Sequence, residues 1–242
     1  MTTDVITRET LASFAYTNET LCDGPIRGML LEFHGLSGGN EMIKAPGDFA
    51  HACAAEGILY VFPYYGPWSW MNDVAVRMVD AVVEALFDRH TLPPDTPVVT
   101  SGGSMGGLSA LIYTRYARRR PVACAANCPV CDLPYHYIER EDLPRTLYQA
   151  FGHYPGTLEE AMETASPLHQ AAQLPDIPYL ILHCTADQAV SKARHSDRLV
   201  EAMRRAGRTV TYVAVPDRGH CDLSPGAAAQ YRQFLFSAAK RR

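Results

Sequence analysis

Short apolar runs alternate with longer amphipathic segments along most of the chain, and this alternation constrains the fold more than any other feature. Six runs are rich in Val, Ile, Leu and Tyr: Met29–Phe33, Ile58–Phe62, Val98–Thr100, Val122–Ala126, Tyr179–His183 and Val210–Val215. They are mostly continuous rather than interrupted by polar residues, as expected for strands that helices cover on both faces. The runs therefore predict a mostly parallel central sheet.

The segments between these runs have helical periodicity. Apolar residues recur at spacings of three and four in 72–90, and further helices are expected over 105–118, 192–206 and 225–239. Strands that alternate with helices predict a doubly wound α/β fold. The more polar first 25 residues could supply antiparallel edge strands.

A single domain accounts for the whole chain, residues 1–242. The sequence contains no internal repeat, linker or low-complexity tract, and 47% of its residues are hydrophobic. A chain of this length buries roughly 70–75% of the surface that its unfolded form exposes, so its core needs neither metal nor disulfide.

The stretch 132–174 interrupts the regular alternation of strands and helices. It is much longer than a usual connection, and it contains several tyrosines and three short helical patterns. A long insertion of this kind is often a lid or binding element. Extra helices that simply pack on the sheet edge are an equal alternative, and in both cases we expect a small cap.

Charge and hydropathy exclude several classes of partner. The formal net charge is −4 and no long block of like charge occurs, which argues against nucleic-acid binding. No window approaches the 18 or so apolar residues of a membrane helix, and the N-terminus lacks the pattern of a signal peptide. We expect a cytoplasmic protein with no nucleic-acid or membrane partner, and the sequence leaves its oligomeric state open.

The seven cysteines are an odd number, as expected for reduced thiols rather than a disulfide framework. Cys128 and Cys131, with Cys124 shortly before them, include a C-P-V-C motif that could be a redox pair or half of a zinc site. No second CxxC or HxxxH completes such a site, and the preceding residues are typical of a buried strand. We therefore expect no metal and no cofactor.

The strongest chemical motif is G-x-S-x-G, which Gly102, Ser104 and Gly106 form between an apolar strand and a helical pattern. A nucleophile at such a turn adopts strained backbone angles that lift its side chain clear of the sheet, and the glycines remove side chains that would collide there. The helix that follows directs its free amides toward developing negative charge. Ser104 is the candidate nucleophile.

A serine hydroxyl needs a base, and the base needs an orienting carboxylate. Asp187 and His220 each follow a predicted strand. They come after Ser104 in the chain order Ser, Asp, His that accompanies the G-x-S-x-G nucleophile turn. His183 falls within a strand and is expected to point into packing, while Asp217 and Asp222 lie too close to His220 in sequence. We predict that Asp187 orients His220.

An oxyanion site is expected from the glycine-rich loop 34–39, which follows the first strong strand. Its amide and the amide of Met105 would donate to the oxyanion, and losing one such donor typically costs about 3–4 kcal/mol of transition-state stabilisation. Either Leu36 or Ser37 could supply the first amide, and we favour Leu36.

An aromatic loop follows the second strong strand, with Tyr65, Trp68 and Trp70 among its residues. These side chains could wall a substrate pocket, because binding sites are largely apolar. The alternative is that the tryptophans fix the start of the 72–90 helix against the core.

Taken together, the segments HGLSGG, GGSMGG, CTADQAV and RGHCD resemble the α/β-hydrolase fold, and within it the catalytic domain of the prolyl oligopeptidase group of serine hydrolases. The resemblance runs from about Met29 to the C-terminus; the glycine-rich motifs are shared with dienelactone-hydrolase-like esterases. It implies a serine hydrolase that works through an acyl-enzyme, with a small ester or a short peptide as substrate.

The prolyl oligopeptidases carry a large N-terminal propeller, for which this sequence has no room. We therefore expect cleavage of carboxylic esters, with peptidase activity on short peptides as the alternative. A non-enzymatic binding protein is disfavoured because all three triad positions are filled.

Overall fold

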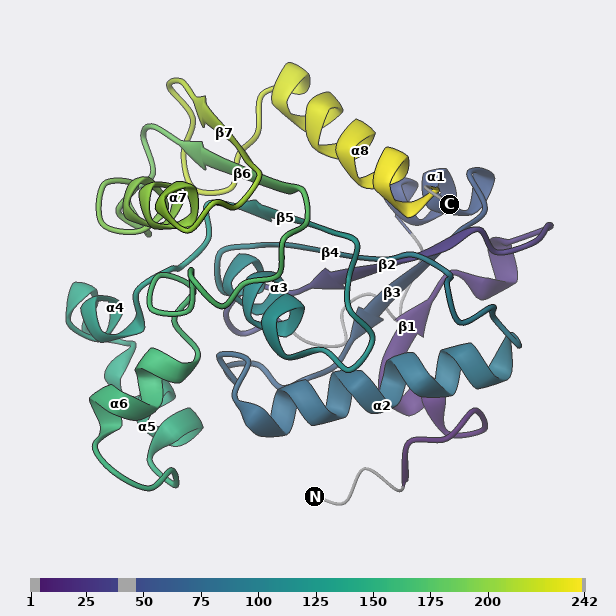
Figure 1. The fold of residues 1–242 in the computed structure, drawn as a ribbon, viewed down its shortest axis with the longest axis horizontal. Helices are drawn as coiled ribbons and strands as arrows, with labels where there is room; N and C mark the ends of the chain where they lie inside the picture. The colour runs from purple at the N-terminus through teal and green to yellow at the C-terminus, as the bar shows by residue number, and fades with distance from the viewer. Residues whose placement is uncertain (1–4, 39–46, 241–242) are drawn as a thin grey trace.

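The predicted sheet is present in the computed structural model, which describes residues 5–38 and 47–240. Seven strands lie in the order β1-β3-β2-β4-β5-β6-β7 (Figure 1). Their bounds are β1 Ala15–Thr17, β2 Gly28–Phe33, β3 Ile58–Pro63, β4 Val98–Gly103, β5 Ala123–Asn127, β6 Tyr179–Cys184 and β7 Val210–Val215. All six apolar runs are therefore strands.

The sheet is parallel except at one edge. Strand β1 pairs antiparallel with β3, with Ala15 opposite Pro63, while every other neighbouring pair is parallel. The polar N-terminal region thus supplies one antiparallel edge strand. Because the other strands run the same way, their carboxyl ends meet at one edge of the sheet, where ligands bind in open α/β folds.

Helices cover both faces of the sheet (Figure 1). Helices α2, α3 and α7 contribute to one large apolar core, and α1 and α8 contribute to a second core on the opposite face. Their bounds are α1 Asp48–Ala55, α2 Asp73–Arg89, α3 Met105–Tyr116, α7 Ser196–Arg205 and α8 Pro225–Ala239; two short 3-10 helices, η2 Leu11–Ser13 and η3 Glu19–Leu21, flank β1.

Two helices differ from the sequence-based expectation. Helix α1 was not predicted, because only Ala50 and Cys53 of its eight residues are buried. Helix α7 begins at Ser196 rather than Lys192. The imidazole of His195 accepts hydrogen bonds from two backbone amides of the segment after β5, so the chain turns before the helix starts.

The insertion forms three short helices, α4 Leu133–Glu139, α5 Pro144–Phe151 and α6 Leu158–Thr164. They lie together beyond one end of the sheet (Figure 1). Leu133, Leu147, Phe151 and Met162 are buried in the same apolar core as α3. The insertion is therefore a small packed cap, as predicted. Within residues 5–38 and 47–240, no helix combines the length and apolar character that crossing a bilayer requires.

Candidate active site

Three predicted catalytic residues lie beyond the carboxyl ends of neighbouring strands. Ser104 follows β4, Asp187 follows β6, and His220 lies in the loop after β7. Since β4 and β6 flank β5 and β7 is the next strand, residues far apart in the sequence converge at one edge.

Ser104 lies at a sharp turn between β4 and α3. Its backbone has φ 60° and ψ −125°, a conformation that non-glycine residues rarely adopt. A Cβ atom at Gly106 would lie 2.0 Å from the carbonyl oxygen of Phe33, and one at Gly102 would lie 2.4 Å from the oxygen of Gly106. The two glycines of the motif are therefore required for the close approach of this turn to β2.

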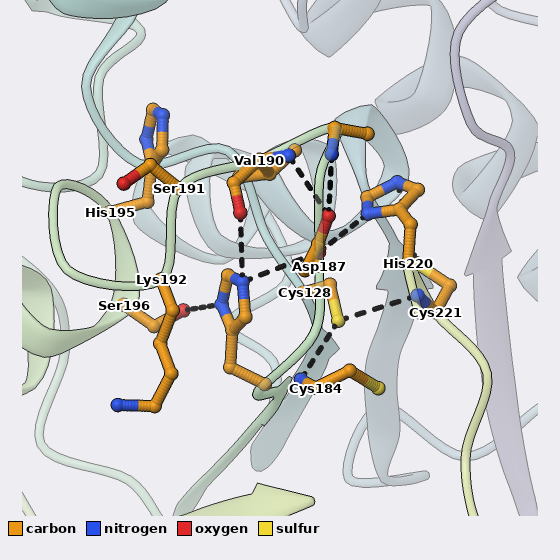
Figure 2. A network of polar contacts seen from close by, with 12 residues as sticks. Cys128, Cys184, Asp187, Val190, Ser191, Lys192, His195, Ser196, His220 and Cys221 are labelled. Carbon is orange, nitrogen blue, oxygen red and sulfur yellow. Dashed lines mark hydrogen bonds and ion pairs between the residues drawn. The ribbon is translucent and has the colours of Figure 1, made fainter. Parts of the chain in front are cut away.

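Asp187 and His220 form a close pair. Nδ1 of His220 donates to Oδ2 of Asp187 at 2.7 Å, and the Asp187 side chain is fully buried whereas that of His220 is 27% exposed (Figure 2). The backbone amides of Ala189 and Val190 donate to the other carboxylate oxygen at 2.8 and 3.0 Å. The carboxylate is thus fixed in position, and it fixes the imidazole in turn.

His183 contacts the same carboxylate oxygen as His220. Its Nε2 lies 3.3 Å from Oδ2 of Asp187 and 3.1 Å from the carbonyl oxygen of Val190. A carbonyl only accepts, so Nε2 carries a proton, and in the neutral ring Nδ1 accepts from the Ser196 hydroxyl at 2.6 Å. His183 is buried, as predicted for a strand residue, but it also helps to hold Asp187.

The contact of His183 with Asp187 was not predicted from the sequence. The only signal was the spacing of four residues between His183 and Asp187 at a strand end.

These hydrogen bonds shift the proton affinities of the pair. Burial raises the pKa of the Asp187 carboxyl, but the hydrogen bonds from His183, His220 and two amides outweigh it and hold the pKa far below its usual range. Burial lowers the pKa of His220, but the hydrogen bond to Asp187 and the contact with Cys128 outweigh it and raise this pKa from 6.5 to about 9. Asp187 is therefore ionised at neutral pH and stabilises the imidazolium.

Ser104 and His220 are not hydrogen-bonded to each other in the described structure. Nε2 of His220 lies 3.7 Å from Sγ of Cys221 instead. Catalytic hydrogen bonds are often long in free enzymes and shorten when substrate binds. Proton transfer between Ser104 and His220 therefore requires a shorter contact than the one in this structure.

The competing acidic and basic residues are either exposed or paired with other side chains. Asp222 forms an exposed ion pair with Arg218, and Asp217 is exposed. Nε2 of His195 pairs with Glu139, and His169 lies 3.7 Å from Glu163. None of these four side chains forms a hydrogen bond or ion pair with His220.

Backbone hydrogen bonds in the glycine-rich loop after β2 distinguish the two candidate oxyanion donors, Leu36 and Ser37. The amide of Ser37 donates to the carbonyl of Pro67 at 2.7 Å. Within the described residues, the amides of Leu36 and Met105 donate to no other protein group. Leu36 therefore fits the role better than Ser37. Gly39, the last residue of the motif, lies outside the described residues.

The aromatic loop is mostly packed against the protein. Trp70 is 1% exposed, and its indole donates to the Thr146 hydroxyl of α5 at 3.1 Å. Tyr65 is 4% exposed, stacks on His34 and donates to its carbonyl. Trp68 is half-buried and donates to Gln149 at 2.7 Å.

A direct substrate contact is thus not supported for Trp70 or Tyr65, and the structure favours a packing role for them. Of the three predicted pocket residues, Trp68 is half-buried, whereas Tyr65 and Trp70 are buried.

The C-P-V-C motif does not form a pair of facing thiols. Sγ of Cys131 contacts the carbonyl of Pro129, whereas Sγ of Cys128 accepts from the amides of Cys184 and Cys221. Burial raises the pKa of Cys131 well above its ordinary value. A reactive thiolate pair is therefore not supported by the geometry.

Among the described residues, His136, Glu139 and His195 form one group with metal-ligating atoms close together. Both imidazoles hydrogen-bond to the Glu139 carboxylate, at 2.6 and 2.9 Å. Nδ1 of His195 already accepts hydrogen bonds from two backbone amides. Nε2 therefore carries the ring proton and has no lone pair for a metal. This group instead joins the cap to the loop that follows Asp187.

The parallel sheet, the strained serine turn and the converging Asp187–His220 pair define a serine hydrolase of the α/β-hydrolase fold. Residues 71–237, more than half of the chain, match the prolyl oligopeptidase family. The chain belongs to this family.

Solved structures of the same fold include esterases and peptidases. A carbohydrate esterase from gut microbiota matches with a TM-score of 0.71 and 13% identity, over 90% of this chain and 87% of that one. An S-formylglutathione hydrolase from Agrobacterium tumefaciens matches with a TM-score of 0.70 and 16% identity, over 94% and 88% of the two chains.

A puromycin-hydrolyzing peptidase from Mycobacterium tuberculosis matches with a TM-score of 0.73 and 20% identity, over 90% of this chain but 35% of that one. The comparison with curated proteins returned no match. Identities this low show the fold alone.

Proposed function

We propose that the protein hydrolyses small carboxylic esters through an acyl-enzyme formed on Ser104. The observation that carries this proposal is the fixed Asp187–His220 pair at the strand edge that also presents Ser104. Ser104 attacks the carbonyl carbon while His220 takes the hydroxyl proton, and Asp187 stabilises the imidazolium. The proton then passes from His220 to the leaving alkoxide. A water molecule, deprotonated by His220, next attacks the acyl-enzyme and releases the carboxylic acid and Ser104.

The amides of Leu36 and Met105 stabilise the oxyanion of the tetrahedral intermediate. Met105 is the first residue of α3, so its amide points out of the helix N-terminus. The free amide of Leu36 and the occupied amide of Ser37 support this assignment. Trp68 is the proposed contact for the substrate's acyl or alcohol part.

Two comparisons support the choice of ester over peptide. The carbohydrate esterase and the S-formylglutathione hydrolase share the fold over 87% and 88% of their own chains. The puromycin-hydrolyzing peptidase shares it over only 35% of its chain. Membership of the prolyl oligopeptidase family keeps short-peptide cleavage as the second candidate function.

We also propose a cytoplasmic location. All seven cysteines are free thiols, and reduced thiols are typical of that compartment.

We expect kcat/KM for p-nitrophenyl acetate or butyrate to exceed that for the matching aminoacyl anilides by about 100-fold or more. A phenolate leaves readily, whereas an amine must be protonated as it departs, a general-acid contribution of about 10²–10⁴-fold. A panel of esters, lactones and anilides measures this difference. Anilide turnover equal to or above ester turnover would contradict the ester proposal and support the peptidase.

The pH dependence tests the role of His220. Only its neutral form accepts the Ser104 proton, and that form predominates above its pKa, which the Asp187 hydrogen bond and the Cys128 contact raise to about 9 despite burial. Ester kcat/KM should therefore rise with pH through a midpoint displaced toward about 9. A midpoint at or below 6.5, the ordinary histidine value, would contradict this assignment.

A further inference from the structure

A cluster of thiols lies directly beside the Asp187–His220 pair. Cys128 follows β5, Cys184 ends β6, and Cys221 follows His220 in the loop after β7. Sγ of Cys128 accepts from the amides of Cys184 and Cys221 at 3.3 and 3.4 Å (Figure 2). The cluster comes from three strand ends, so no sequence motif marks it.

Three potential ligand atoms of this cluster are mutually close. Sγ of Cys128, Sγ of Cys221 and a ring nitrogen of His220 all lie within 4.8 Å of one another. Nε2 of His220 and Sγ of Cys221 are 3.7 Å apart. In a tetrahedral zinc site with Zn–S of about 2.3 Å and Zn–N of about 2.0–2.1 Å, a sulfur and a nitrogen ligand are separated by about 3.6 Å. The spacing therefore fits one ion.

The surroundings also suit a metal-bound state. The other ring nitrogen of His220, Nδ1, donates a hydrogen bond to the Asp187 carboxylate at 2.7 Å. Such a carboxylate–histidine pair orients imidazoles that bind metals. The two amides that donate to Sγ of Cys128 would stabilise the negative charge of a thiolate.

The cluster is reached from solvent on the side of His220 and Cys221. The His220 side chain is 27% exposed and Cys221 is half-buried, whereas Cys128 is buried behind them. An ion would approach past His220, and a water molecule on that side would complete its coordination.

We propose that Cys128, His220 and Cys221 bind a thiophilic divalent cation such as Zn²⁺, and that the bound ion inhibits the enzyme reversibly. The two thiols each release a proton and become thiolate ligands, and His220 contributes the lone pair of Nε2 while Nδ1 keeps its proton. This lone pair is the one that accepts the Ser104 proton in the proposed mechanism. The inhibitory half of the inference therefore rests on the proposed function, whereas metal binding does not.

The binding test uses Cd²⁺ as a spectroscopic substitute for Zn²⁺ with the full chain. Cadmium–thiolate bonds give an ultraviolet charge-transfer band, and we expect this band to saturate at one equivalent. Cys221→Ser should weaken Cd²⁺ binding at least about tenfold, since it removes one of three protein ligands. Cys22→Ser is the matched control, because its thiol contacts Asn18 and lies outside the cluster.

An absent band, or an equal band in Cys221→Ser, would overturn the proposed site. Cys221 is half-buried, and circular dichroism of Cys221→Ser confirms that the variant is folded. The His136–Glu139–His195 group contains no sulfur and does not contribute to the band.

The inhibition test measures ester turnover during a Zn²⁺ titration, followed by addition of EDTA. We expect Zn²⁺ to abolish turnover of the unmodified protein, EDTA to restore it, and Cys221→Ser to need at least about tenfold more Zn²⁺. A cadmium–thiolate band without loss of turnover would overturn the inhibitory half and place the catalytic base elsewhere. Loss of turnover that is equal in Cys221→Ser would overturn the assignment of the inhibitory ion to this site.

Discussion

Replacing Ser104 with alanine is expected to lower kcat for ester hydrolysis by about 10⁴- to 10⁶-fold and to abolish covalent labelling by a fluorophosphonate. Alanine lacks the attacking oxygen, so no acyl-enzyme forms. Binding and the oxyanion amides remain, which leaves a small residual rate. Rapid-quench or steady-state assays with p-nitrophenyl esters, together with gel-based labelling, measure both effects.

The fold should survive this substitution. Alanine keeps the Cβ atom, so the backbone strain at φ 60° is similar to that of serine. The backbone of residue 104 also keeps its hydrogen bonds to Asn127, Gly107 and Leu108. An unchanged circular dichroism spectrum would therefore accompany the loss of activity.

Ser237→Ala provides a matched control, because Ser237 is an exposed serine on α8. It should keep full labelling and turnover. Near-normal activity in Ser104→Ala would show that another residue is the nucleophile.

The sequence predicted the sheet well because its central strands, β2 to β6, are almost entirely buried. Continuous apolar runs such as Tyr179–His183 cannot be stable in solvent, and all six became strands. Helix α2 was also predictable, since its buried residues recur along one face. Helix α1 escaped prediction because eight residues with two buried side chains give too weak a periodic signal.

The candidate site was predictable where backbone chemistry dictates residue type. The glycines on either side of Ser104 are required by close backbone contacts, so the motif is visible in the sequence. Tertiary contacts without such a local requirement were not visible. The contact of His183 with Asp187 depends on how the loop after β6 turns back, and the meeting of Cys128 with Cys221 depends on how β5 and β7 lie in the sheet.

The aromatic loop shows the limit of composition as evidence. Tryptophans near a strand end suit a pocket wall and a buried anchor equally well. Trp70 is an anchor because its indole N–H finds a buried partner in Thr146 of the cap. That partner lies 76 residues further along the chain, so only the folded structure distinguishes the two roles.

Asp187→Asn is expected to lower ester kcat by about 10⁴-fold while the protein remains folded. The carboxylate accepts from two amides at Oδ1 and from two imidazoles at Oδ2. An asparagine has one acceptor oxygen and one NH₂ group, so it cannot satisfy both sides. If its NH₂ faced the amides of Ala189 and Val190, donors would oppose donors in a fully buried position.

The asparagine oxygen will therefore face these amides, and its NH₂ will face Nδ1 of His220. Nδ1 must then accept, which moves the ring proton of neutral His220 to Nε2. This tautomer has no lone pair at Nε2 to accept the Ser104 proton, so the base is lost although the imidazole stays in place. His183 keeps its hydrogen bond to Val190 and supports the loop.

Steady-state ester assays of Asp187→Asn and Asp222→Asn test this argument. Asp222 is exposed and paired with Arg218, so its asparagine variant should keep turnover close to that of the unmodified protein. Retained activity in Asp187→Asn together with loss in Asp222→Asn would transfer the orienting role to Asp222. Loss of ester turnover in Asp187→Asn alone would support His220 as the base, with its tautomer set by the buried Asp187 carboxylate.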